Sequence, residues 1–196
     1  MTYWKLCDVK LDWTAVDQDL AKYKNDTEYL NSFLEHNEFS RTWNDGLYEI
    51  TQRYRAYGYN EKNTLLWKST AKPKSIEFTW QNDLLAQLPL DNAIVCLTRQ
   101  DPGQAIPWHQ DNFFMLRRLY PEDHRTIVRV LLFMDNWKNG QLLQIGDEFL
   151  HHWHRGEVYI WPPDTWHLAG NVGYETKWTC NITGFVNDPE LIKLLT

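Results

Sequence analysis

Several features that would indicate a particular class of protein are missing from this sequence. Its three cysteines, Cys7, Cys96 and Cys180, are odd in number, scattered and never in CxxC spacing. Neither a disulfide framework nor a structural zinc site is therefore predicted. No apolar run reaches the roughly 18 residues of a membrane helix, and the first residues contain no apolar signal-peptide core. We therefore expect a reduced protein in the cytoplasm, with no membrane as a partner.

An excess of basic residues is also missing, since the formal net charge is −6. Neither nucleic acid nor an anionic membrane surface is favoured as a partner by that charge. Single-stranded nucleic acid remains open in principle, because bases can stack on aromatic side chains beside a local basic groove. The sequence contains no internal repeat and no low-complexity tract, and it predicts no oligomeric state.

What the sequence has in abundance is aromatic side chains, which make up 15% of its 196 residues and include eleven tryptophans. A chain of this length is the size of one domain and can bury a core. So many large rings are typical of a domain that has a walled cavity or broad sheet faces to fill.

The character of the chain changes once, near Leu90. Residues 1–90 are predicted to be a helical support region, because apolar residues recur there at helical spacing. Asp26-Thr27 and Asn44-Asp45 are candidate helix caps, and Asp83–Gln87 is a candidate short helix. Thr64–Trp67 and Ser75–Trp80 are candidate strands.

Residues 91–186 are predicted to be the core, built from closely spaced short strands. The predicted strands are Ala93–Gln100, Trp108–Phe114, Ile127–Met134, Gln141–Ile145, Glu148–Trp153, Glu157–Trp161, Trp166–Asn171 and Lys177–Phe185. Asn139-Gly140 predicts a two-residue hairpin turn, and Gly146-Asp147 and Arg155-Gly156 predict further turns. Eight short strands separated by such turns indicate a jelly roll or a barrel.

The most informative spacing is His109-Gln110-Asp111. On a strand, residues i and i+2 point to the same face, so an imidazole and a carboxylate would project together. A further histidine completes the 2-His-1-carboxylate facial triad of non-heme iron(II), which leaves three coordination positions open. His167, near the start of a late predicted strand, is the candidate third ligand.

Other histidines compete for this role. His151, His152 and His154 resemble a metal cluster, but no carboxylate accompanies them at strand spacing, and a solvated strand end explains them better. His36 and His124 fall in a predicted helix and a predicted loop, with no partner nearby in the sequence.

Two basic residues stand in predicted strands. Lys177 shares its strand parity with Thr179, Asn181 and Thr183, and that polar face is either solvated or directed to the inside, where a buried cation needs an anion. Arg129 interrupts an apolar strand. It either lies at a sheet edge or faces the inside, where its planar fork would hold a carboxylate.

These residues resemble the iron(II)- and 2-oxoglutarate-dependent oxygenase superfamily over roughly residues 93–186. The matched elements are the HxD of His109 and Asp111, the distal His167, and the basic Lys177 ten positions later. The resemblance implies a mainly β fold, a double-stranded β-helix (a cupin-like jelly roll) with the N-terminal helices packed on the outside. It also implies iron(II), dioxygen, and 2-oxoglutarate as co-substrate, with Lys177 binding its distal carboxylate and Thr179 and Asn181 lining the same site.

Within the superfamily, the chain is most similar to the aspartyl/asparaginyl β-hydroxylase-like group. The similarity lies in the order of the Arg129 strand, the turn around Gly156, and Trp166-His167. The arginine of that group contributes to carboxylate binding, which makes Arg129 a second candidate anchor beside Lys177. Best-known members of the group lack the carboxylate ligand that Asp111 supplies here, so the same substrate is not implied.

The predicted activity is hydroxylation of a C–H bond in a small molecule or a protein side chain. The candidate substrate residues are Arg99, Trp108, Asn112, Tyr159 and Trp161. Two alternatives stay open, a cupin-type metalloenzyme that does not use 2-oxoglutarate and a non-catalytic cupin that binds a ligand or a partner. The direction of Lys177 discriminates between them, because only the oxygenase needs this cation to face the metal side.

Overall fold

Two antiparallel β-sheets form the centre of this computed structural model, which describes residues 2–24, 56–58, 66–69 and 78–195. The strands are β1 (Trp4–Asp8), β2 (Leu66–Ser69), β3 (Leu90–Gln100), β4 (Ala105–His109), β5 (Ile127–Phe133), β6 (Gln141–Ile145), β7 (Glu148–Leu150), β8 (Glu157–Ile160), β9 (His167–Asn171) and β10 (Lys177–Val186). The helices are α1 (Trp13–Tyr23), α5 (Gln81–Leu85), α6 (Phe114–Leu119) and α7 (Pro189–Leu195). None of the helices in these ranges has the length and hydropathy that crossing a membrane requires.

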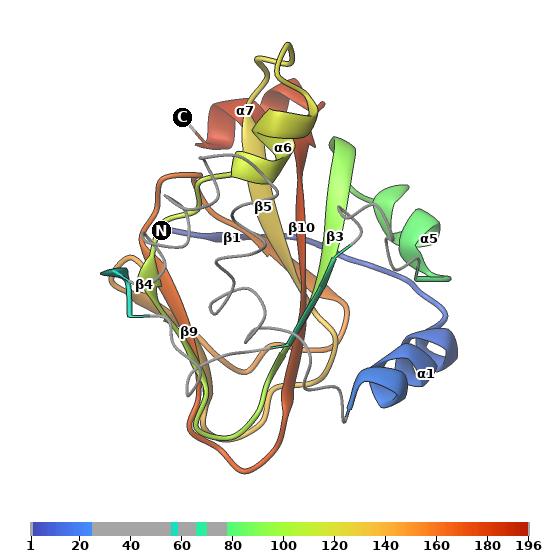
Figure 1. Cartoon of the computed structure of the whole chain (residues 1–196), viewed down its shortest axis with the longest axis vertical. Coiled ribbons are helices and arrows are strands. Elements are labelled where there is room, and N and C mark those ends of the chain that lie inside the picture. Colours follow the sequence, from blue (N-terminus) through green and yellow to red (C-terminus); the bar gives the residue numbers. More distant parts are fainter. Residues whose placement is uncertain (1, 25–55, 59–65, 70–77, 196) are drawn as a thin grey trace, which may run out of the picture.

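The strand order is that of a double-stranded β-helix. The larger sheet runs β1-β8-β5-β10-β3-β2 and the smaller sheet runs β4-β9-β6-β7. From β3 to β10 the chain passes back and forth between the two sheets, except at the β6–β7 hairpin, which stays in one (Figure 1). The predicted jelly roll of eight strands after Leu90 is confirmed.

Helices cover the outer face of the larger sheet. Trp178, Cys180 and Ile182 of β10 belong to one buried cluster with side chains of α1, α5 and α7. Figure 1 shows these helices outside the strands, which confirms the prediction that N-terminal helices pack on the outside. Because both faces of the larger sheet are covered, β5 is apolar at almost every position.

Arg99 and Asp12 hold the two ends of α1. The Asp12 carboxylate accepts hydrogen bonds from the Thr14 and Ala15 amides, as an N-cap does. The Arg99 guanidinium reaches the other end from the outer face of β3 and donates to the carbonyls of Tyr23 and Lys24, at 2.6 and 2.7 Å. The last carbonyls of a helix point beyond its hydrogen-bond ladder, so the guanidinium helps to satisfy the C-terminus of α1.

The inner faces of the two sheets enclose a second core. Leu131 and Phe133 of β5 pack there with Leu143 and Ile145 of β6. The ring of Trp153 stacks on Phe133 with a centroid distance of 4.0 Å. Residues of β10 with odd numbers share this inner face, since Thr183 is the register partner of Arg129 and Thr179 that of Phe133.

The predicted strand Trp108–Phe114 is too long at its C-terminal end. β4 ends at His109, and α6 begins at Phe114 after a segment with no regular structure. The Asn112 carboxamide oxygen accepts from the Phe114 amide at 3.1 Å, and Phe113 has a positive φ of 51°. A local side-chain hydrogen bond therefore competes with the strand and ends it.

The predicted hairpin at Asn139-Gly140 is wrong. β5 and β6 lie in different sheets, and of the two residues only Gly140 has a positive φ, whereas the predicted turn needs both. The tight hairpin is formed instead at Gly146-Asp147, where Ile145 pairs with Glu148. The turn predicted at Arg155-Gly156 is also present, with Gly156 at φ 93° immediately before β8.

The N-terminal region contributes strands as well as helices. β1 and β2 extend the larger sheet at its two edges, and the α5 helix corresponds to the predicted Asp83–Gln87. The helices predicted after Asp26 and Asn44 and residues 75–77 of the predicted Ser75–Trp80 strand lie outside the described residues. The other half of that predicted strand, residues 78–80, is not a strand but leads by a turn into α5. β1, α1, α6 and α7 were not predicted.

We expect Gly140→Ala to destabilise the fold by about 2–4 kcal/mol. Gly140 has φ +88°, and a Cβ there would lie 2.4 Å from the backbone nitrogen of Gly173. The free-energy cost of a side chain at positive φ and the cost of a clash with the Gly173 backbone would therefore add. Chemical denaturation would measure the loss, with Gly103→Ala as the control, because Gly103 has φ +85° and open space around it. Equal losses in the two variants would contradict a role for the close backbone approach.

Candidate metal centre

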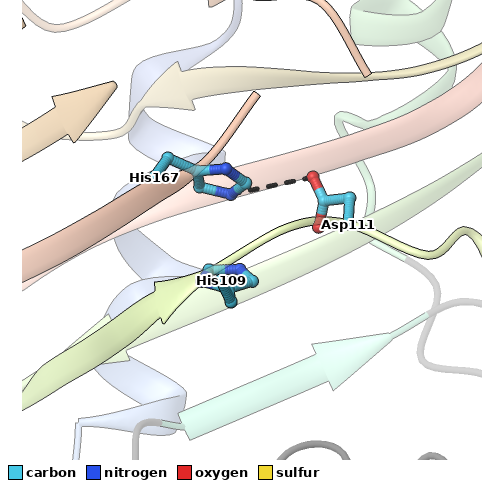
Figure 2. Close-up of side chains that lie close together, drawn as sticks. All are labelled: His109, Asp111 and His167. Atoms are coloured by element: carbon cyan, nitrogen blue, oxygen red, sulfur yellow. Dashed lines mark ion pairs between the residues drawn. The ribbon is translucent and has the colours of Figure 1, made fainter. Parts of the chain in front are cut away.

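His109, Asp111 and His167 come together at one end of the smaller sheet (Figure 2). One ligand atom from each side chain lies within 4.8 Å of the others. His109 is the last residue of β4 and His167 the first of β9, and the two are register partners. Within the described residues this is the one group of three or more potential ligands so close together.

Backbone carbonyls fix the orientation of both imidazoles in the same way. The Nδ1 of His109 is 2.8 Å from the Pro107 carbonyl oxygen, and the Nδ1 of His167 is 2.9 Å from the Thr165 carbonyl oxygen. A carbonyl only accepts hydrogen bonds, so each Nδ1 carries the proton and each Nε2 keeps its lone pair. This arrangement is typical of the support around metal-binding histidines.

The two imidazoles are neutral at neutral pH. Each is only 5% exposed, and burial lowers the pKa of His109 to about 4, with the nearby His167 adding to the effect. Burial likewise lowers the pKa of His167. Neutral imidazoles are the form that binds metal, so these ligands do not have to lose a proton first.

Arg129 reaches this group from the larger sheet. Its Nη1 donates to Asp111 Oδ1, and its Nε donates to the Thr183 hydroxyl at 3.1 Å. The other carboxylate oxygen, Oδ2, is 3.7 Å from His167 Nε2, the pair joined by the dashed line in Figure 2. β5 is an inner strand of its sheet, so of the two interpretations of Arg129, the inward-facing one is correct.

Lys177 also faces inward. Its Nζ donates to the Leu142 carbonyl of β6, in the opposite sheet, at 2.8 Å and lies 5.2 Å from the ring centroid of Trp153. The side chain is 2% exposed, and burial lowers its pKa to about 7. Within the described part of the chain no carboxylate pairs with this ammonium. A buried lysine of this kind is stabilised when an anion is brought to it.

Polar side chains continue along the inner face of β10 between Lys177 and Arg129. The Thr179 hydroxyl is 2.5 Å from the Thr98 hydroxyl of β3. Asn181 follows and is half-buried, and Thr183 is the residue that binds Arg129. We call Lys177, Thr179, Asn181 and Thr183 the polar row.

The five candidate substrate residues lie in different parts of the structure. The ring centroid of Trp161 is 5.0 Å from that of His167, and Tyr159 faces the inner core, where its hydroxyl donates to Glu157 at 3.2 Å. Trp108 is partly exposed and stacks on Trp166. Asn112 follows Asp111 directly, and its carboxamide oxygen accepts from the Phe114 amide at the start of α6. Arg99 lies on the outer face of the larger sheet, against the end of α1.

The competing histidines are on the surface. His151, His152 and His154 are exposed and follow the end of β7 at Leu150. The Nδ1 atoms of His151 and His152 are 2.6 Å apart, and His152 packs on Trp137. They agree with the prediction of a solvated strand end. His124 is exposed in a loop, and His36 lies outside the described residues.

The contacts of two neighbours of the site were not predicted from the sequence. Phe113 packs against the Arg129 guanidinium, and Trp153 packs against the Lys177 ammonium. Each contact joins two separate segments of the chain, so no local sequence pattern predicts it. The Leu142 carbonyl is a backbone group that any residue would supply.

The donor set fits a divalent metal ion. Two neutral imidazoles and one carboxylate occupy one side of a metal and leave positions for other ligands, as in non-heme iron(II) sites. Zinc enzymes also use two histidines and a carboxylate. The residues therefore indicate a metal centre, and this donor set suits both iron(II) and zinc.

Comparisons with known proteins bear on the fold of this chain and not on its function. No protein-family model matches the chain, and no curated protein matches its sequence. A cupin 2 conserved barrel domain protein from Salinispora arenicola is 13% identical, over 72% of this chain and 89% of that one, with a TM-score of 0.39. The cupin domain of Cnp3 from Schizosaccharomyces pombe is 11% identical, over 70% and 74%, with the same TM-score.

A predicted oxalate decarboxylase from Thermotoga maritima is more distant, at 10% identity over 47% of this chain and 65% of that one, with a TM-score of 0.34. Likenesses at this level carry no information about ligand or substrate. The double-stranded β-helix is assigned from the strand order of this chain.

Proposed function

We propose that this chain is an iron(II)- and 2-oxoglutarate-dependent dioxygenase that hydroxylates a C–H bond of a small-molecule or peptide substrate. The observation that carries the proposal is that the candidate metal centre and the buried cation Lys177 share the space between the two sheets, with the polar row extending from one toward the other. A metal site alone would need no such cation.

The separation of the two groups favours a short dicarboxylate. His167 pairs with Ile145 of β6, and the Lys177 ammonium reaches Leu142 on the same strand, three residues away. At the rise of a β-strand this is about 10 Å. A ligand that contacts both groups must then be an extended molecule, with an anionic group at the Lys177 end and a metal-binding group at the other; a short dicarboxylate has both, and a single small anion does not.

The residues of this chain would have four tasks. His109, Asp111 and His167 would hold the metal on one side, and Lys177 would neutralise the distal carboxylate of the co-substrate. Thr179 and Asn181 would line the path between them. Trp161 and the Phe133–Trp153 stack would keep water away from a reactive centre. When bound, iron(II) with 2-oxoglutarate and dioxygen would supply the oxidising power, with succinate and carbon dioxide as co-products.

One observation favours a second candidate function. The Lys177 ammonium already donates to the Leu142 carbonyl, so the residue has a hydrogen-bonding role within the fold. If that role were its whole purpose, the centre would belong to a cupin-type metalloenzyme that does not use 2-oxoglutarate.

Anaerobic titration with iron(II) and then 2-oxoglutarate tests the proposal. We expect a visible metal-to-ligand charge-transfer band only when both are present, because the band arises from a keto acid chelated to iron(II). If iron(II) binds stoichiometrically but 2-oxoglutarate produces no band and is never consumed in air, the second candidate is the better account. If the protein does not bind iron(II), the assignment of the metal centre is itself wrong.

A further inference from the structure

Asp111 differs from the two histidines in having no strand to hold it. β4 ends at His109, and residues 110–113 have no regular secondary structure before α6 begins. Phe113, at the end of this segment, has a positive φ of 51°, which is uncommon for a bulky residue. The backbone alone therefore does not determine where the carboxylate of Asp111 points.

Arg129, in contrast, is held firmly. It lies on β5 between β8 and β10, and its Nε donates to the hydroxyl of its register partner Thr183. Its guanidinium carbon is 6.0 Å from the ring centroid of Phe113. The guanidinium is thus attached to the rigid sheet on one side and to the irregular segment on the other.

The contacts of Asp111 divide its two oxygens between different partners. Oδ1 accepts from the Arg129 guanidinium, and Oδ2 faces His167 Nε2 at 3.7 Å. The Asp111 side chain is only 4% exposed, so these protein groups dominate the surroundings of both oxygens. An oxygen engaged by a guanidinium is less available to a metal, which leaves Oδ2 as the donor.

We infer that Arg129 is a positioning residue that holds Asp111 so that the metal receives one carboxylate oxygen and not two. This inference rests on the proposed metal centre but assigns Arg129 a role different from co-substrate binding. A carboxylate that chelates through both oxygens would occupy one of the coordination positions that a facial triad leaves open. Arg129 would preserve that position through the carboxylate, without touching the metal.

The experiment compares Arg129→Gln, Arg129→Lys and Thr183→Val with the parent protein. Cobalt(II) serves as the probe, since its visible absorption reports coordination number, and iron(II) affinity is measured anaerobically. Arg129→Gln should weaken metal binding about tenfold to a hundredfold, as loss of supporting contacts around a metal does, and should change the cobalt(II) spectrum. Arg129→Lys should recover part of the affinity, because it keeps the charge but loses the fork.

Thr183→Val removes only the support of the guanidinium and should change both readouts in the same direction by a smaller factor. Arg125→Gln is the matched control, because Arg125 pairs with Asp91 and Asp123 on the exposed surface. Far-UV circular dichroism of the metal-free variants confirms folding, and Thr183→Val provides the test if Arg129→Gln does not fold.

Unchanged metal affinity and an unchanged cobalt(II) spectrum in folded Arg129→Gln would overturn the inference. If that variant then lost 2-oxoglutarate affinity instead, Arg129 would be a co-substrate ligand and the proposed function would stand. Failure of the proposed function looks different, because the parent protein itself would then show no charge-transfer band.

Discussion

Replacing either histidine of the centre, as His109→Ala or His167→Ala, is expected to abolish stoichiometric iron(II) binding while the protein remains folded. Each change removes one of three ligands, and the imidazole that remains is held in its orientation by a backbone carbonyl. The cost to stability should stay near 1–3 kcal/mol for the lost buried contacts. Anaerobic equilibrium dialysis measures the metal, and far-UV circular dichroism the fold.

The control for this result is a triple variant in which His151, His152 and His154 are all replaced by alanine. These histidines are exposed and are not among the three residues that come together at the centre, so iron(II) binding should stay at the parent level. Tight stoichiometric binding in both single variants, together with its loss in the triple variant, would show that the metal binds at the surface cluster.

Lys177→Ala is expected to raise the 2-oxoglutarate requirement about tenfold to a hundredfold and to leave iron(II) affinity nearly unchanged. A charge-assisted contact between the ammonium and a carboxylate is worth roughly 1.5–3 kcal/mol, and Lys177 reaches no metal ligand. Lys177→Met is the matched variant, because it keeps the packing against Trp153 without the charge. Succinate formation as a function of 2-oxoglutarate concentration measures the effect, and Lys177→Arg should recover part of it.

The same residue predicts a pH dependence with a defined sign. Burial lowers the pKa of Lys177 to about 7, and the groups that face it are a carbonyl and an indole, neither of which titrates. An anion binds best to the protonated form, so 2-oxoglutarate affinity should fall as the pH rises above 7 in the parent protein. The affinity of Lys177→Met should be nearly flat over that range. A parent affinity independent of pH between 7 and 9 would contradict this role.

The parts of the fold that could be predicted were those encoded by repeated local patterns. Eight short strands after Leu90 and the shared parity of Lys177, Thr179, Asn181 and Thr183 follow from alternation along single strands. Alternation alone does not decide that this face points inward, which the contact of Lys177 with the opposite sheet shows. Asn139-Gly140 shows the limit, because a strong local turn signal lies where the chain must cross from one sheet to the other. Which strands share a sheet is decided by burial across the whole domain, and a dipeptide carries no information about it.

In the candidate site too, local patterns predict some features and not others. The spacing of His109 and Asp111 and the place of His167 on a late strand predict the three residues that come together. The prediction that Asp111 lies on a strand, on one face with His109, is wrong, because β4 ends at His109. The spacing still worked because a chain leaving β4 travels only two residues before Asp111. The contact of Arg129 with Asp111 joins residues 18 positions apart on different elements. No one-dimensional pattern predicts such a contact.

The position of the centre within its sheet has a kinetic consequence. β4 is the outermost strand of the smaller sheet, and its pairing with β9 is irregular between Ile106 and His109. Outer strands with such irregularities are among the first segments to detach in local opening. A metal ion bound by both His109 and His167 would link β4 to β9 at their last register pair. Release of the ion would then be coupled to local opening of β4, and the lifetime of the bound ion would report how often this edge of the barrel opens.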